Sequence, residues 1–221
     1  MTDIGRRGFM KRAVATAAAA AFGAVVLAPG AVAQDEPQDL MSYLNGRPLP
    51  RVGEDIPVRV SAANVPLKLN ALGALTLDFK GGVNLKVKTS KTDGLVMEVQ
   101  GFHVEADTSP STPDSGTLIA MSVTRAAITP HSVLQAADGG GVEMLIHLSL
   151  TVEATDKATG ETTSALSTDP TKYATLKATD VKEFPPVNQL CTLLEPVQLY
   201  DPQGNRAGTL EGFDAIMSKA D

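Results

Sequence analysis

The stretch GVEMLIHLSLTVEA, residues 141–154, decides the fold. Its even positions form an unbroken apolar row: Val142, Met144, Ile146, Leu148, Leu150, Val152 and Ala154. The odd positions are polar except Leu145, and they include His147, which we expect to face solvent. Such alternation predicts a β-strand with one buried face. At roughly 3.3 Å per residue this strand is about 43 Å long, a length that suits a closed barrel or a strongly curved sheet.

The same period-two pattern recurs along the chain. It covers residues 65–71, 75–79, 83–87, 95–106 and 117–129. Gly81-Gly82 and Asp93-Gly94 supply turn signals between these runs. Alternating runs separated by tight turns, without a helix long enough to connect parallel strands, predict an antiparallel arrangement. The fold class is therefore mostly β, a single antiparallel β-barrel, with a β-sandwich as the alternative.

Helical patterns are confined to short segments. Apolar spacing predicts a helix over residues 186–194, a second near 213–217 and a helical turn over residues 40–44. Cys191 lies among leucines in the first of these, so we expect it to be buried there as a small apolar residue. These pieces are expected to cover the barrel.

The N-terminus has the anatomy of an export signal. A basic segment over residues 5–12 precedes an alanine-rich, uncharged run over residues 13–28, and Ala31 and Ala33 form a small-residue cleavage site. We therefore expect a cleaved signal over residues 1–33 and a single β-rich domain over residues 34–221. The run is too weakly apolar for a good membrane-spanning helix, so no stable membrane anchor is expected.

Within this signal, the hexapeptide RRGFMK closely resembles the twin-arginine (Tat) motif of bacterial export signals. The residues that match are Arg6, Arg7, Phe9 and Lys11. The resemblance covers residues 1–33 and implies transport by the Tat translocation machinery. It also implies export of an already folded protein to a secreted or extracytoplasmic location.

Charge and composition exclude several classes of partner. Removal of residues 1–33 takes four basic residues from 19 and one acidic residue from 25, which leaves a net charge of −9. With no basic run, the chain is a poor candidate for nucleic acid or anionic membranes. Trp is absent and aromatic residues make up 4% of the chain, which disfavours stacking surfaces. Cys191 is the one cysteine, so no intramolecular disulfide braces the fold.

No nucleophile, dinucleotide or phosphate-binding motif occurs, and the three histidines are too isolated to predict a metal or cofactor site. One candidate acid–base pair remains. The apolar phase switches at Gly101, and two alternatives follow. A β-bulge there would place His103 and Glu105 in solvent. An uninterrupted register would place both inside, where burial shifts pKa values as catalysis needs.

The alternating faces predict an apolar interior, either fully packed or holding a ligand. The candidate ligand-binding residues are Met97, Val99, Met121, Val123, Met144, Ile146 and Leu148. The expected function is an exported carrier or sequestering protein that encloses an apolar small molecule, as lipocalins do. The alternative is a cofactor-free cyclase or isomerase that folds a flexible apolar substrate. Small β-barrel cyclases of bacterial polyketide pathways are similar in size and strand content, an analogy of fold alone. A purely apolar lining would favour the carrier.

Overall fold

The computed structural model describes residues 40, 44, 46, 48–91, 94–112, 115–123 and 130–220. The chain divides into two compact units, Met1–Asp35 and Glu36–Asp221, and every described residue belongs to the second. The predicted export signal over residues 1–33 lies outside the described residues. Among those described, no helix is both long and apolar enough to cross a membrane.

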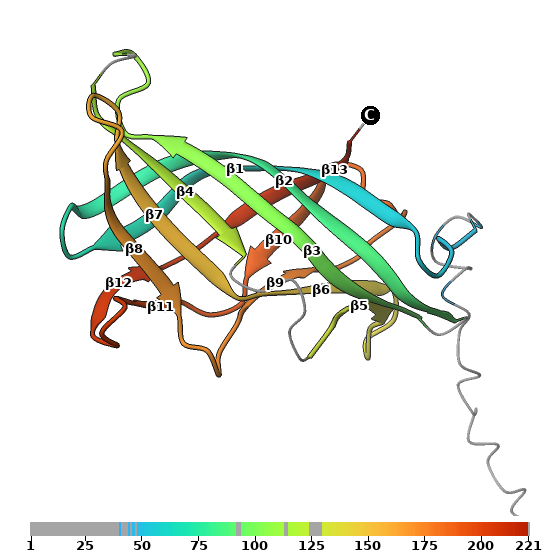
Figure 1. Ribbon diagram of the computed structural model, residues 1–221. Helices are drawn as coiled ribbons and strands as arrows, with labels where there is room; N and C mark the ends of the chain where they lie inside the picture. Colours follow the sequence, from blue (N-terminus) through green and yellow to red (C-terminus); the bar gives the residue numbers. More distant parts are fainter. Residues whose placement is uncertain are drawn as a thin grey trace, which may run out of the picture. The chain divides into compact units, whose positions relative to one another are not determined.

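The described residues form thirteen β-strands (Figure 1). Their bounds are β1 Asp55–Leu69, β2 Gly73–Lys91, β3 Gly94–Asp107, β4 Thr117–Val123, β5 Ser132–Ala136, β6 Val142–Leu148, β7 Leu150–Asp156, β8 Thr162–Thr168, β9 Ala174–Ala178, β10 Gln189–Leu193, β11 Val197–Tyr200, β12 Arg206–Leu210 and β13 Asp214–Lys219. All of their pairings are antiparallel. The prediction of a mostly β, antiparallel fold is confirmed.

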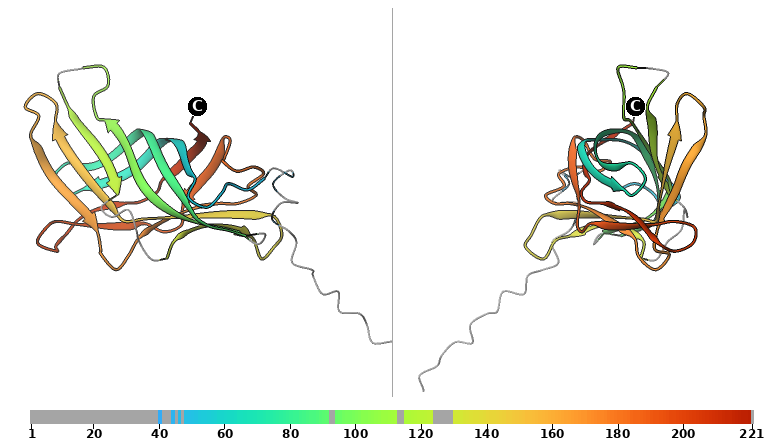
Figure 2. Two further views of the ribbon diagram at one scale, coloured as in Figure 1. Left: turned by 45° about the vertical axis from the view of Figure 1, so that its right-hand side comes forward. Right: turned by 90° about the vertical axis from the view of Figure 1, so that its left-hand side faces the viewer.

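The sheet closes on itself, as a barrel requires. The strand order is β12-β11-β8-β7-β4-β3-β2-β1-β13-β10-β9-β6-β5, with additional pairings of β12 with β1 and of β3 with β5. These two pairings join the ends of the sheet to its middle, so the strands curve around a common interior (Figure 2). Each of the thirteen described strands therefore has a partner on both sides, which is how barrels avoid edge-to-edge aggregation. The predicted barrel is confirmed over the sandwich alternative.

The topology of the barrel is easier to follow when strands that lie end to end are counted as one row. β1, β2 and β3 are long and uninterrupted, and they lie side by side in Figure 1. The other ten strands form five end-to-end pairs: β4 with β5, β6 with β7, β8 with β9, β10 with β11, and β12 with β13. Each pair forms one row of the wall. Consecutive rows are neighbours, and the last row pairs with β1, which gives an up-and-down barrel of eight rows.

The stretch 142–154 forms one such row, made of β6 and β7. All seven of its even-numbered side chains are buried, with 1–2% of their surface exposed, so the predicted inner face is confirmed. The row is interrupted at Ser149, between Leu148 and Leu150. Because a single residue separates the strands, the even phase continues through the break and both leucines point inward.

The phase switch in β3 is a β-bulge. Asn84 of β2 pairs with Gly101 and Leu85 pairs with Val99, so Gln100 is the extra residue. The bulge turns Phe102, and with it the following even residues, toward the interior. On β2, Gly81 is required by close packing, since a Cβ there would lie 2.0 Å from the carbonyl oxygen of His103.

Two of the predicted helices are wrong. Residues 189–193 form β10 and residues 214–219 form β13. Their helical spacing misleads because Val187, Leu190 and Ile216 are exposed on the outside of the barrel. Leu190 and Ile216 are direct partners in the sheet, so both belong to extended strands and not to helices. Cys191 is buried as predicted, but on a strand.

The predicted helical turn near residue 40 agrees with what the structure describes there. The backbone N–H of Leu44 donates to the carbonyl of Leu40 at 3.2 Å. Both leucines are buried against the barrel core, with at most 1% of their surface exposed. These two leucines therefore act as an apolar cover.

Candidate functional site: the barrel interior and the outer groove

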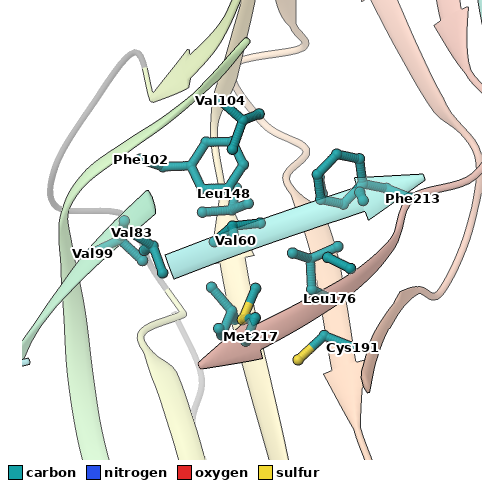
Figure 3. Packing of buried hydrophobic residues seen from close by; sticks show 14 of the residues in the cluster. Val60, Val83, Val99, Phe102, Val104, Leu148, Leu176, Cys191, Phe213 and Met217 are labelled. Atoms are coloured by element: carbon teal, nitrogen blue, oxygen red, sulfur yellow. The ribbon is translucent and has the colours of Figure 1, made fainter. Parts of the chain in front are cut away.

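The barrel interior contains a small void with a wholly apolar lining. Its volume is about 10 Å³. The lining residues are Phe102, Met121, Leu148, Leu150, Ala174, Leu176, Leu193, Leu210 and Phe213. Phe102 and Phe213 are distant in the sequence, and their rings contact edge to face with centroids 6.4 Å apart. Figure 3 shows these two rings and Leu148 among the buried side chains of the core. We call this space the interior void.

The volume of the void shows whether the interior is packed or open. A cavity of roughly 10–15 Å³ on this measure holds about one water molecule. The interior of the described barrel is therefore packed, and a larger guest has to displace side chains. The core also contains Met97, Met144 and Met217, each with at most 1% of its surface exposed. Methionine side chains adapt to irregular spaces better than branched ones do.

The predicted ligand-binding residues all belong to the inner face, but few of them reach the void. Met97, Val99, Met144 and Ile146 are buried in the surrounding core, and Val123 is half-buried. Met121 and Leu148 line the void. Sequence reasoning missed its remaining lining residues. Phe102 was detectable, since the bulge alternative at Gly101 turns it inward.

Two buried hydroxyl groups lie beside the break at Ser149, and each accepts a backbone hydrogen bond. The hydroxyl oxygen of Ser132 accepts from the backbone N–H of His147 at 3.1 Å. That of Thr168 accepts from the backbone N–H of Leu150 at 3.2 Å. These side chains replace ladder bonds around the break, as buried backbone donors require. Their position indicates a structural role rather than a catalytic one.

A larger pocket lies on the outside of the barrel. It is beside the part of the wall where Ala174 and Leu193 line the interior void. Its volume is about 340 Å³, near the lower end of small-molecule sites. The lining residues are Thr168, Asp169, Lys172, Tyr173, Thr175, Leu194, Glu195, Pro196, Val197, Gln198 and Tyr200. We call this pocket the outer groove. Its lining mixes hydroxyl, amide, carboxylate and ammonium groups with apolar ones, unlike the interior void.

The outer groove follows an interruption of the wall. The row of β8 and β9 pairs with the row of β10 and β11 up to Leu193↔Leu176, and pairing resumes at Leu199↔Thr168. Between these points, residues 194–198 face residues 169–175. We call these two segments the wall gap. Within it, the backbone N–H of Leu194 donates to the carbonyl of Thr175 at 3.0 Å.

His147 lies behind this groove, and its expected exposure is wrong. Only 8% of its surface is exposed. Its ring contacts that of Tyr173 edge to face at a centroid distance of 4.7 Å, and its Nδ1 lies 3.0 Å from the hydroxyl oxygen of Thr175. Burial lowers the pKa of His147 below its ordinary value of 6.5, because desolvation disfavours the charged ring. The imidazole is therefore neutral at pH 7.

His103 and Glu105 are brought together, but outside the barrel. Their side chains are 58% and 48% exposed, and His103 Nε2 lies 2.8 Å from Glu105 Oε1. The alternative that placed this pair inside as an acid–base site is wrong, because the bulge sends Phe102 and Val104 inward instead. An exposed side-chain contact of this kind contributes little to stability. Among the described residues, no group of histidine, cysteine and carboxylate side chains is arranged to hold a metal ion.

Comparison with solved structures shows a similarity of fold. No known protein family matches the sequence, and no curated protein matches it. The chain is similar to the solved structure of DynF from the dynemicin biosynthesis pathway of Micromonospora chersina. The TM-score is 0.56 at 14% identity, over 77% of this chain and 81% of that one. At this identity the similarity shows a shared barrel-like fold and nothing finer.

Proposed function

We propose that the protein binds an apolar small molecule inside its barrel and acts as a carrier or sequestering protein. The observation that supports this most strongly is the interior void, whose lining contains no polar side chain. An apolar space excludes charged and hydrogen-bonding guests, since their polar groups would lose water without gaining partners. The part of a ligand that lies in this space must therefore be apolar.

Binding must displace side chains, and the position of the void makes this feasible. Leu148 and Leu150 flank the break at Ser149, Leu193 ends β10, and Phe213 precedes β13. Side chains at strand ends are supported by fewer ladder bonds than those within a strand. Together with the methionines of the core, they give the void a lining that can rearrange around a guest.

The same lining favours a carrier over the cyclase or isomerase alternative. Catalysis on a folded substrate needs some polar groups aimed at the reacting atoms. The buried hydroxyls of Ser132 and Thr168 do not line the void, and each accepts a hydrogen bond from the backbone instead. The fold shared with DynF, a protein of a biosynthetic pathway, is compatible with either function.

The test uses 1,6-diphenyl-1,3,5-hexatriene, an uncharged rod-shaped fluorophore, in a fluorescence titration. The absence of Trp from the chain removes an interfering emission. We expect saturable binding of one probe per protein. Ala174→Val reduces the void and should weaken binding. Ala178→Val is the control, because Ala178 lies on the same face of β9, is equally buried and does not line the void. Absence of binding, or equal effects of the two variants, contradicts the proposal.

Export of the carrier through the Tat machinery is a second part of the proposal, supported by the RRGFMK motif and the alanine-rich run after it. Replacing both Arg6 and Arg7 with Lys should stop export of a folded reporter fused after Gln34 in Tat-competent cells. Normal export of the double variant would remove the Tat assignment while leaving the barrel's binding function untouched.

A further inference from the structure

We propose that the wall gap is a lateral entrance to the barrel and that the ligand is a chain-like amphiphile. In this arrangement an uncharged hydroxyl-bearing head lies in the outer groove, and an apolar chain occupies the interior void. This inference rests on the proposed function, because it assigns a route and a ligand class to the same interior.

The wall between the two spaces is a single layer of backbone. Leu193 lines the interior void, whereas the next residue, Leu194, lines the outer groove. On the facing segment, Ala174 lines the void, whereas Tyr173 and Thr175 on either side line the groove. Consecutive residues of a strand point to opposite faces, so the void and the groove are the two faces of one stretch of wall.

This stretch of wall is also poorly paired. Seven residues, 169–175, face five residues, 194–198, between the ladder pairs Leu193↔Leu176 and Leu199↔Thr168. By contrast, β4 and β7 pair without interruption from Thr117↔Asp156 to Val123↔Leu150. Opening a hydrogen-bonded ladder costs the bonds that are broken. The wall gap is therefore a place where the barrel can separate and re-close with the loss of few bonds.

The shape and chemistry of the two spaces select the ligand. A narrow separation of two strands admits a chain more easily than a rigid ring system. A molecule that spans both spaces must be apolar at one end and polar at the other. The groove contains the carboxylates of Asp169 and Glu195 and the ammonium of Lys172, so charges of both signs are present. An uncharged head that hydrogen-bonds, for example to the Tyr200 hydroxyl, fits this mixture best.

The entrance is tested by a disulfide across the wall gap. Leu194 and Thr175 follow the pair Leu193↔Leu176 by one register step, so they face one another. Opposite residues of antiparallel strands have Cα atoms roughly 4.5–5.5 Å apart, within the range a disulfide spans. The variant carries Leu194→Cys and Thr175→Cys with Cys191→Ala. Stopped-flow mixing with diphenylhexatriene should give association and dissociation at least about tenfold slower when oxidised than when reduced, with an unchanged Kd.

A second disulfide is the matched control. Ala120→Cys with Glu153→Cys joins facing residues of β4 and β7, away from the wall gap. It should leave both rates unchanged. Equal rates for the oxidised and reduced forms of the first variant overturn the entrance. If the unmodified protein binds no probe at all, the proposed function itself fails.

The head group is tested separately. Displacement of bound diphenylhexatriene measures the affinity for 1-decanol. Tyr200→Phe should weaken 1-decanol by about threefold or more, the loss of one neutral hydrogen bond, without changing the affinity for diphenylhexatriene, which has no polar head. Unchanged 1-decanol affinity, or an equal loss for both molecules, overturns the assignment of the head to the outer groove.

Discussion

His147 of β6 and Tyr173, which precedes β9, contact edge to face on the outside of the barrel with ring centroids 4.7 Å apart. Tyr173 is 37% exposed and lines the outer groove, whereas His147 is buried beneath it. Because His147 also bonds to Thr175, it holds both neighbours of Ala174. This pair therefore fixes the β9 side of the wall gap.

The buried state of His147 makes stability depend on pH. Its pKa is lowered in the folded protein, so the unfolded chain takes up a proton first as pH falls. The stabilisation is complete above about pH 6.5, the ordinary pKa of histidine, and decreases as pH falls below it. The variant His147→Gln has no imidazole at this position, so its free energy of unfolding lacks this pH-dependent contribution. Urea denaturation from pH 8 to pH 5 should show the free energy of unfolding falling more steeply for the natural protein than for the variant.

The other titrating groups are common to both proteins, so they cancel in this comparison. Carboxylates with lowered pKa values, such as Asp107 beside Lys157, lose their stabilisation only at more acidic pH. A difference between natural protein and variant that is constant over this range would contradict the assignment of a neutral, buried imidazole.

The facing of β7 is tested by adjacent substitutions. Val152 is 1% exposed and points inward, whereas Glu153 is exposed. Val152→Asn buries an amide without partners and should lower the free energy of unfolding by about 2–4 kcal/mol. Glu153→Asn should change it by about 1 kcal/mol or less. Equal losses in urea denaturation would show that the strand does not have one buried face.

Cys191 should behave as an inert thiol. It is fully buried, and desolvation raises its pKa to about 12. A thiol reagent at pH 8 should modify it slowly in the native protein and rapidly in denaturant, because the thiolate is the reactive form. The matched control is Leu190→Cys in a Cys191→Ala background. Leu190 is 49% exposed on the opposite face, so its replacement should react rapidly without denaturant. Rapid native labelling at position 191 would contradict the strand assignment of residues 189–193.

Two glycines should differ in their tolerance of a methyl group. Gly81→Ala would place a Cβ 2.0 Å from the His103 carbonyl oxygen, so β2 and β3 must separate. We expect a loss of roughly 3 kcal/mol or more, which is the range of large local distortions. At Gly101 a Cβ meets nothing within 4 Å, and Gly101→Ala should be close to neutral. Thermal unfolding of both variants measures the contrast, and equal Tm values would contradict the observed approach of the two strands.

The fold was predictable because its main determinant is local. An apolar residue at each even position from 142 to 154 reveals an inner face wherever the strand lies in the sheet. The break at Ser149 is invisible in that pattern, since Leu148 and Leu150 keep the phase. The burial of His147 depends on Tyr173, a residue distant in the sequence, so alternation alone assigns it to solvent.

The void and the outer groove were less predictable than the fold, because both are formed by residues that are distant in the sequence. The void depends on how side chains from several rows fill the interior, and no local pattern specifies that sum. The prediction of a helix over residues 186–194 was also wrong because of a tertiary contact. Leu190 has helical spacing, but it pairs with Ile216 in the sheet. Long-range pairing therefore overrides local periodicity in short segments.

The most direct test of the central claim is the location of a bound apolar molecule. Uniformly ¹³C-labelled protein, saturated with diphenylhexatriene, should give intermolecular nuclear Overhauser effects to the methyl group of Met121, which lines the interior void. Contacts with the rings of Phe102 and Phe213 should accompany them. Contacts confined to exposed residues such as Val187 and Ile216 would place the probe on the outer surface and contradict the account.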